Sequence, residues 1–212
     1  MIKIIVTDDH KMFRESLFNI FTTKKIAEII GEAGNGLELL ELLKNQKPDI
    51  VLMDIAMPLM DGIEATKRAL QMQPGLKILA LSGFDDDKYY FSMVEAGVKG
   101  FVLKNSGINE LKKAIKEVSQ DNSWFSPELL QKLFIKINES PKKRSSKNDL
   151  SDRETEVLKY ICESLTNEQI AEKMNVSFET VKWHRTNIMS KTGCTNTAGL
   201  VIYAIKNKLI EI

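Results

Sequence analysis

The chain has 212 residues, of which 43% are apolar and 28% charged, and its formal net charge is +1 at pH 7. This length allows one large domain or two ordinary ones, and the composition argues against wholesale disorder and collagen-like repetition. No stretch approaches the roughly 20 apolar residues that cross a bilayer, and no cleavage site follows the apolar N-terminus. We therefore expect a soluble cytoplasmic protein with no membrane segment. The two cysteines, Cys162 and Cys194, have neither metal-ligand spacing nor a disulfide framework.

Neither half of the chain is strongly basic. Residues 1–120 carry 16 Lys and Arg against 17 Asp and Glu, and residues 121–212 carry 14 against 12. Any affinity for nucleic acid must therefore come from local clusters of charge, because a domain-wide positive field is missing.

Short apolar segments alternate with longer segments of helical periodicity over residues 1–120. The predicted strands are Ile2–Val6, Ile26–Glu32, Asp49–Met53, Lys77–Leu81 and Lys99–Leu103. The predicted helices are His10–Phe21, Gly36–Asn45, Gly62–Met72, Asp86–Ala96 and Ile108–Ser119. Apolar strands separated by amphipathic helices indicate a parallel sheet covered on both faces. We expect an α/β, flavodoxin-like doubly wound domain of five parallel strands and five helices.

The pattern changes over residues 121–148. Ser126 followed by Pro127 is typical of a helix start and predicts a short helix over Glu128–Ile137. The polar, basic stretch Pro141–Asn148 has no periodicity and indicates an exposed linker.

Residues 149–212 contain no strand pattern and predict an all-α domain of four helices. Capping boxes at Ser151 and Thr166 begin the first two helices, Ser177 caps the third, and the fourth begins at Asn196. The four helices are expected to end near Ser164, Met174, Lys191 and Lys208. A three-residue turn joins the two middle helices, which favours a helix-turn-helix unit over a plain bundle.

Polar residues stand at the carboxyl ends of the predicted strands, where ligands bind in doubly wound folds. Asp8 and Asp9 follow the first strand, Asp54 the third, Ser82 the fourth and Lys104 the fifth. Each alone is typical of a turn or a solvated loop. Together, three carboxylates favour a hard divalent cation such as Mg²⁺, and a lysine with a hydroxyl suits phosphoryl oxygens. The set predicts a site for phosphoryl chemistry with Asp54 as the acceptor.

These motifs resemble the receiver domain of bacterial two-component response regulators over residues 1–120. The matching segments are Thr7–His10, Met53–Gly62, Ala80–Gly83 and Gly100–Lys104. The resemblance implies that a sensor histidine kinase phosphorylates Asp54 and that Ser82 and Lys104 grip the phosphoryl group. It also implies that Asp9, Asp54 and the Ala56 carbonyl ligate Mg²⁺, with Asp8 acting mainly through water. Phe101 matches the switch aromatic of the family, which turns inward when the serine moves toward the phosphoryl group.

In a helix-turn-helix unit the second helix presents its N-terminal residues to the major groove. On the corresponding helix, Val181, His184 and Ile188 are spaced to face the core. The candidate DNA contacts are Thr180, Lys182, Trp183, Arg185, Thr186 and Lys191. Simpler interpretations stay open, since Lys182 suits a solvated position, Trp183 a partly buried one, and Arg185 a pair with an acid.

The C-terminal motifs Leu150–Leu158, Thr166–Ala171 and Thr180–Arg185 resemble the LuxR-type helix-turn-helix. Together with the receiver motifs they resemble the NarL/FixJ subfamily of response regulators. This implies a phosphorylation-controlled regulator that binds double-stranded promoter DNA as a homodimer, formed through the last helix. The apolar residues of that helix either form the dimer face or pack on the bundle; they are Leu200, Val201, Ala204 and Ile205.

Two alternatives remain from the residues alone. An aspartyl-nucleophile phosphatase commonly carries a second aspartate two residues after the nucleophile, and Ala56 occupies that position here. We therefore do not expect an enzyme. The second alternative is a protein-interaction module whose helices never meet DNA.

Overall fold

The computed structural model of the chain describes residues 1–83, 89–125, 150–207 and 209–210. The chain divides into two compact units, Met1–Phe125 and Ser126–Ile212. The predicted short helix over Glu128–Ile137 and the predicted linker over Pro141–Asn148 lie outside the described residues.

The first unit is built on a five-stranded parallel sheet with the order β2-β1-β3-β4-β5. The strands are β1 (Lys3–Thr7), β2 (Glu28–Ala33), β3 (Ile50–Asp54), β4 (Lys77–Ser82) and β5 (Gly100–Leu103). This sheet confirms the predicted doubly wound fold, and every strand boundary lies within two residues of its prediction.

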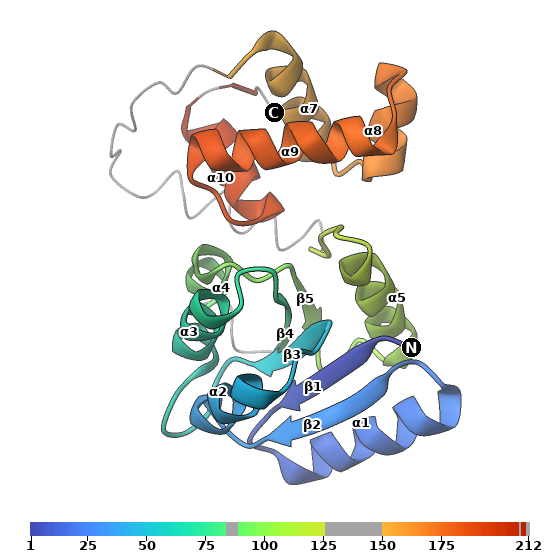
Figure 1. Ribbon diagram of the computed structural model, residues 1–212, viewed down its shortest axis with the longest axis vertical. Helices are drawn as coiled ribbons and strands as arrows, with labels where there is room; N and C mark the ends of the chain where they lie inside the picture. The colour runs from blue at the N-terminus through green and yellow to red at the C-terminus, as the bar shows by residue number, and fades with distance from the viewer. Residues whose placement is uncertain (84–88, 126–149, 208, 211–212) are drawn as a thin grey trace. The chain divides into compact units, whose positions relative to one another are not determined.

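Helices cover both faces of this sheet (Figure 1). They are α1 (Lys11–Lys24), α2 (Gly36–Asn45), α3 (Gly62–Met72), α4 (Tyr90–Ala96) and α5 (Ile108–Ser119). Helices α1 and α5 pack on one face, and α2, α3 and α4 lie on the other. The predicted start of the fourth helix at Asp86 falls within residues 84–88, outside the described ranges.

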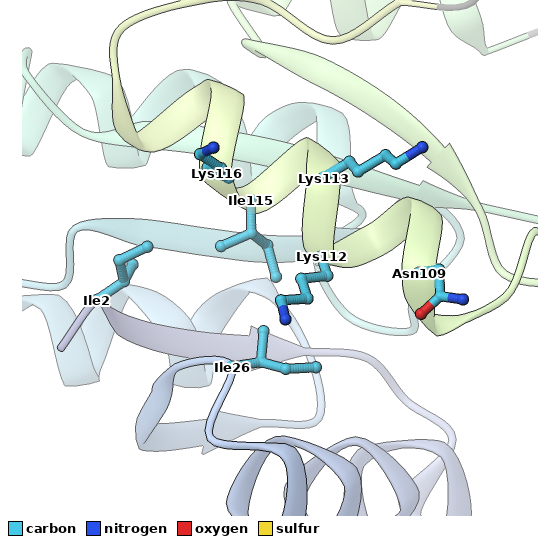
Figure 2. Close-up of a pocket in the computed structure, with 7 residues that line it drawn as sticks. All are labelled: Ile2, Ile26, Asn109, Lys112, Lys113, Ile115 and Lys116. Atoms are coloured by element: carbon cyan, nitrogen blue, oxygen red, sulfur yellow. The ribbon is translucent and has the colours of Figure 1, made fainter.

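An open pocket of about 530 Å³ lies beside α5, at the amino-terminal ends of the strands (Figure 2). Ile2 and Ile26, which precede β1 and β2, line it together with Ile115. The other lining residues are polar and come from α5: Asn109, Lys112, Lys113 and Lys116. Because the acidic residues stand at the opposite ends of the strands, this pocket is separate from them.

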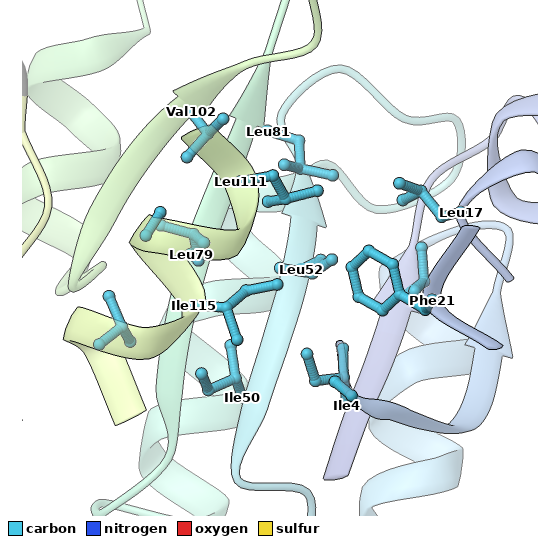
Figure 3. Packing of buried hydrophobic residues seen from close by; sticks show 14 residues of the cluster. Ile4, Leu17, Phe21, Ile50, Leu52, Leu79, Leu81, Val102, Leu111 and Ile115 are labelled. Atoms are coloured by element: carbon cyan, nitrogen blue, oxygen red, sulfur yellow. The ribbon is translucent and has the colours of Figure 1, made fainter. Parts of the chain in front are cut away.

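An apolar core lies between the sheet and the two helices α1 and α5 (Figure 3). Ile4, Leu52 and Leu79 from the strands meet Phe21 of α1 and Ile115 of α5, each at most 1% exposed. Burying a side chain of this size stabilises the fold by about 1.5–3 kcal/mol. This packing fixes the strands, and therefore the positions of the residues at their carboxyl ends.

The chain returns to β5 near the end of the first unit. The Trp124 N–H donates to the Lys99 carbonyl at 3.0 Å, and the Phe101 N–H donates to the Trp124 carbonyl at 2.8 Å. A Cβ atom at Gly100 would lie 2.5 Å from the Trp124 carbonyl oxygen, so only glycine allows this close approach.

The described residues of the second unit form four helices, α7 (Asp152–Cys162), α8 (Asn167–Met174), α9 (Phe178–Thr192) and α10 (Thr197–Lys206). Both predicted capping boxes are present, Ser151 with Glu154 and Thr166 with Gln169. Asn175 ends α8 in the left-handed conformation, and Ser177 caps α9, as the turn prediction required. Among the described residues, none of the helices combines the length and the apolar character required to cross a membrane.

Candidate functional site

The carboxyl ends of β1, β3 and β5 bring two carboxylates and one ammonium together. The Lys104 Nζ atom lies 2.8 Å from Asp8 Oδ2 and 3.0 Å from Asp54 Oδ1. The side chains of Asp8 and Asp54 are 0% and 4% exposed, whereas Asp9 is exposed. The structure therefore assembles at one point residues that are up to 96 positions apart in the sequence.

Backbone groups fix the position of Asp54. Its Oδ1 atom accepts a hydrogen bond from the Ile55 N–H at 2.9 Å. The loop after β3 then folds back, and the Gly62 N–H donates to the Ile55 carbonyl at 2.9 Å. A Cβ atom at Gly62 would lie 2.1 Å from the Asp54 carbonyl oxygen, so glycine is required where α3 starts against β3.

A second group of contacts fixes Asp8 and Asp9. The His10 N–H donates to Asp8 Oδ1 at 2.9 Å, and the His10 ring nitrogen Nδ1 lies 2.8 Å from Asp9 Oδ1. Arg14 Nη1 donates to the Asp8 backbone carbonyl at 2.6 Å and pairs through Nε with Glu32. Helix α1 thus begins directly against the acidic residues.

Burial makes the ionised form of Asp54 costly. Burial raises the pKa of Asp54 to about 6, and the neighbouring Asp8 carboxylate adds to the increase. The Lys104 ammonium and the Ile55 N–H lower the pKa of Asp54 but do not cancel the increase. Burial also lowers the pKa of Lys104, but its contacts with Asp8 and Asp54 outweigh that effect and leave the pKa raised. The lysine is therefore a permanent cation, and the site retains an unfavourable excess of negative charge.

The donor set suits a hard divalent cation. One ligand atom from each of Asp8, Asp9, His10 and Asp54 lies within 4.8 Å of the others. The Asp8 Oδ2 atom is buried and accepts no well-aligned hydrogen bond, although it is in ion-pair distance of Lys104. An oxygen-rich cluster with an unsaturated carboxylate oxygen fits Mg²⁺ better than a soft transition metal. Ala56 lies in the exposed loop after β3, two residues beyond Asp54.

Ser82 and Phe101 are connected through Tyr90. The Ser82 Oγ donates to the Gly83 carbonyl at 3.0 Å and lies 3.3 Å from the Tyr90 hydroxyl. The Tyr90 ring meets the Phe101 ring edge-on, with centroids 5.0 Å apart. The Lys104 N–H donates to the Ser82 carbonyl at 2.8 Å, which holds the serine next to the lysine. Phe101 is only 6% exposed, so its ring is buried against Tyr90 in this conformation.

Sequence reasoning did not assign roles to three residues of this site, His10, Arg14 and Tyr90. His10 directly follows Asp8 and Asp9 in the Thr7–His10 motif, and this position in the sequence could have indicated its contact with them. Arg14 and Tyr90 act from helices, and no local pattern marks them, because their contacts with Asp8 and Phe101 are made through the tertiary fold.

On helix α9 the core face differs from the predicted one. Val181 and Ile188 are fully buried as expected, but the third buried residue is Arg185, while His184 is half-buried. Arg185 is 9% exposed and donates through Nη2 to Thr197 Oγ1 at 2.6 Å, and burial lowers its pKa to about 10. In this position the guanidinium faces α10.

Lys191 also has a structural partner. Its Nζ atom lies 2.7 Å from Glu154 Oε2, and Glu154 is 4% exposed. Burial raises the pKa of Glu154, but hydrogen bonds from Lys191 and Ser151 outweigh it, so the pKa is below its ordinary value. This ion pair ties α9 to the start of α7.

The remaining candidate contacts lie on the outer side of α9. Lys182, Trp183 and Thr186 are exposed, and Thr180 is half-buried, with its hydroxyl 2.8 Å from that of Ser177. Trp183 is 61% exposed, and its ring meets His184 edge-on at 4.9 Å. These four residues form the outer α9 face, a polar surface with one large aromatic side chain.

The apolar residues of α10 pack within the bundle. Leu200 and Ala204 are fully buried, Val201 is 9% exposed, and Ile205 packs against the same core cluster. The structure therefore shows these residues packed on the bundle, which is one of the two arrangements expected for them.

Comparison with known proteins matches each of the two units to a known domain family. Residues 4–116 match the response regulator receiver domain, and residues 148–204 match the family described as bacterial regulatory proteins, luxR family. The chain is 34% identical over 211 residues to the response regulator protein VraR of Staphylococcus aureus, covering 99% of both proteins. Among solved structures, the response regulator ChrA of a heme-sensing two-component system is 31% identical, with a TM-score of 0.53 and coverage of 99% and 98%. RcsB of Salmonella enterica serovar Typhimurium bound to promoter rprA is 24% identical, with a TM-score of 0.56 and coverage of 99% and 100%, and shares the fold.

Proposed function

We propose that this chain, which belongs to the NarL/FixJ subfamily of two-component response regulators with a LuxR-type DNA-binding domain, is switched by phosphorylation of Asp54. The observation that carries the proposal is the contact of Lys104 Nζ with both Asp8 and Asp54, at 2.8 and 3.0 Å. This contact brings a nucleophilic carboxylate and a cation suited to a phosphoryl oxygen to one point.

Asp54 attacks the phosphorus of a phosphohistidine on a sensor histidine kinase. The new bond joins Asp54 Oδ to phosphorus, and the bond to the histidine nitrogen breaks. Asp9, Asp54 and the Ala56 carbonyl would hold Mg²⁺, with Asp8 acting mainly through water. The bound cation would supply charge neutralisation between the carboxylates and the phosphoryl oxygens. Lys104 remains protonated and balances the added charge.

The switch starts at Ser82. A phosphoryl group adds about −1.5 to −2 charge and three acceptor oxygens. The Ser82 hydroxyl donates to one of them and leaves its contacts with Gly83 and Tyr90. Because Tyr90 packs on Phe101, the change passes to α4 and β5 through a shift between two packings of these rings.

The output is DNA binding by the outer α9 face. Thr180, Lys182, Trp183 and Thr186 contact the major groove and its phosphates, whereas Arg185 and Lys191 serve the scaffold. We propose a homodimer on DNA, and a regulator without catalytic turnover that works in the cytoplasm. The VraR relative and the DNA-bound RcsB fold support this assignment.

The test uses the full chain with acetyl phosphate and Mg²⁺. Mass spectrometry should find one stable phosphoryl group on Asp54, and labelling should increase affinity for DNA. Asp54→Asn should remove both effects, whereas Asp61→Asn is the matched control, because Asp61 is an exposed helix cap that asparagine can replace. Labelling that persists in Asp54→Asn, or rapid multiple turnover of the donor, would contradict the proposal.

A further inference from the structure

The outer α9 face carries a single large apolar side chain. Among the described residues of the second unit, Trp183 is the one large hydrophobic residue that is exposed. It lies two residues from both Val181 and Arg185, which are buried, and two residues correspond to about 200° around an α-helix. The indole therefore projects from the side of α9 that faces away from the bundle core.

The indole is also supported in its position. The His184 ring meets it edge-on, with centroids 4.9 Å apart and planes at 67°. His184 is half-buried, with a buried Nδ1 atom, and its ring packs beside the indole. A side chain whose rotamers are restricted by a neighbouring ring loses less conformational entropy when it binds a ligand.

The chemistry of the major groove limits what an indole can recognise there. The groove presents hydrogen-bonding groups from all four bases, and the 5-methyl group of thymine is the largest apolar group among the base edges. An exposed indole between Lys182 and Thr186 has an apolar face that can pack on this methyl group.

We infer that Trp183 contacts thymine through its 5-methyl group and makes the chain prefer sites with thymine at that position. This inference rests on the proposed function, because it requires α9 to enter the major groove. Beyond that function, it specifies the base that this chain selects, thymine, and the residue that selects it, Trp183. Burial of one methyl group corresponds to about a fourfold change in affinity.

The experiment begins with selection of bound duplexes from a random-sequence DNA library by the full phosphorylated chain. The preferred duplex is then synthesised with each thymine in turn replaced by deoxyuridine, which lacks only the 5-methyl group. Fluorescence anisotropy should show at least one position in each half-site where this change weakens binding about fourfold. Trp183→Ala should bind the thymine and deoxyuridine duplexes equally, and Trp183→Phe should keep part of the difference. Circular dichroism checks that both variants are folded.

Three outcomes would overturn the inference. Affinity within twofold for every deoxyuridine duplex excludes a methyl contact. An equal loss in the parent and in Trp183→Ala assigns the contact to another residue. Weaker binding by Trp183→Ala without any effect of deoxyuridine indicates recognition through the indole N–H instead. Failure to enrich any sequence from the library is a different result, since it contradicts the proposed DNA-binding function itself.

Discussion

Replacing Lys104 with methionine removes the ammonium that contacts both buried carboxylates, Asp8 and Asp54. At an effective dielectric constant of about 20, ion pairs at 2.8 and 3.0 Å each contribute about 5–6 kcal/mol before desolvation is counted. Desolvation of the three groups cancels much of this attraction, since the Lys104 side chain is only 22% exposed. Removing one partner of a buried ion pair costs about 3–5 kcal/mol, because the other charge is left uncompensated. We expect Lys104→Met to reduce the free energy of unfolding of the first unit by this amount at pH 7.

The assay is urea unfolding in EDTA, followed by tryptophan fluorescence. The chain has two tryptophans, Trp124 in the first unit and Trp183 in the second, so a Trp183→Phe background isolates the signal of the first unit. Lys112→Met is the matched control, because Lys112 is exposed on α5. Adding Asp54→Asn to Lys104→Met should recover part of the loss, since the amide carries no charge. A loss below about 1 kcal/mol, the range of surface ion pairs, would refute the reasoning.

Three further predictions concern the same structure. Gly62→Ala should destabilise the first unit by about 1–3 kcal/mol, because the new Cβ meets the Asp54 carbonyl oxygen. Gly75→Ala is the control and should not destabilise the unit, because no atom lies within 4 Å of a Cβ at Gly75. Urea unfolding of the two variants measures the difference. The pKa of Glu154 is lower in the folded state than in the unfolded state. The ionised carboxylate therefore stabilises the fold at pH values above the unfolded-state pKa, and this stabilisation is lost as the pH falls through the folded-state pKa. The difference in unfolding free energy between the parent and Glu154→Gln should therefore shrink as the pH is lowered below about 4.5, and a pH-independent difference would contradict it. Lys182→Ala should weaken DNA binding in a gel shift, whereas Arg185→Met should stay within twofold of the parent, because Arg185 faces α10 and not the outer surface.

The sequence was sufficient to predict the fold and the meeting of Asp8, Asp54 and Lys104. Apolar strands alternating with helices specify a parallel sheet, and such a sheet brings its carboxyl ends to one edge whatever the loops contain. The capping boxes at Ser151 and Thr166 were equally clear, because a helix start depends on residues within one turn. These features are local, or follow from topology alone.

Contacts between side chains of different elements could not be predicted in the same way. His184 and Arg185 both lie three or four residues from Val181 and Ile188, so helical spacing cannot decide which of them faces the core. The structure selects Arg185, whose guanidinium finds a hydroxyl acceptor on Thr197 of α10. Likewise, the link from Ser82 to Phe101 depends on where α4 places Tyr90, and no local sequence pattern predicts that position.

The return of the chain at Trp124 has a consequence for self-association. Strand β5 is the edge of the sheet, and an open edge offers unpaired backbone groups on which the strand of another molecule can align. In this protein the Trp124 backbone occupies the N–H of Phe101 and the carbonyl of Lys99 on that edge. We expect a larger residue at Gly100 to displace this segment and to leave these backbone groups of β5 open to pairing with another chain.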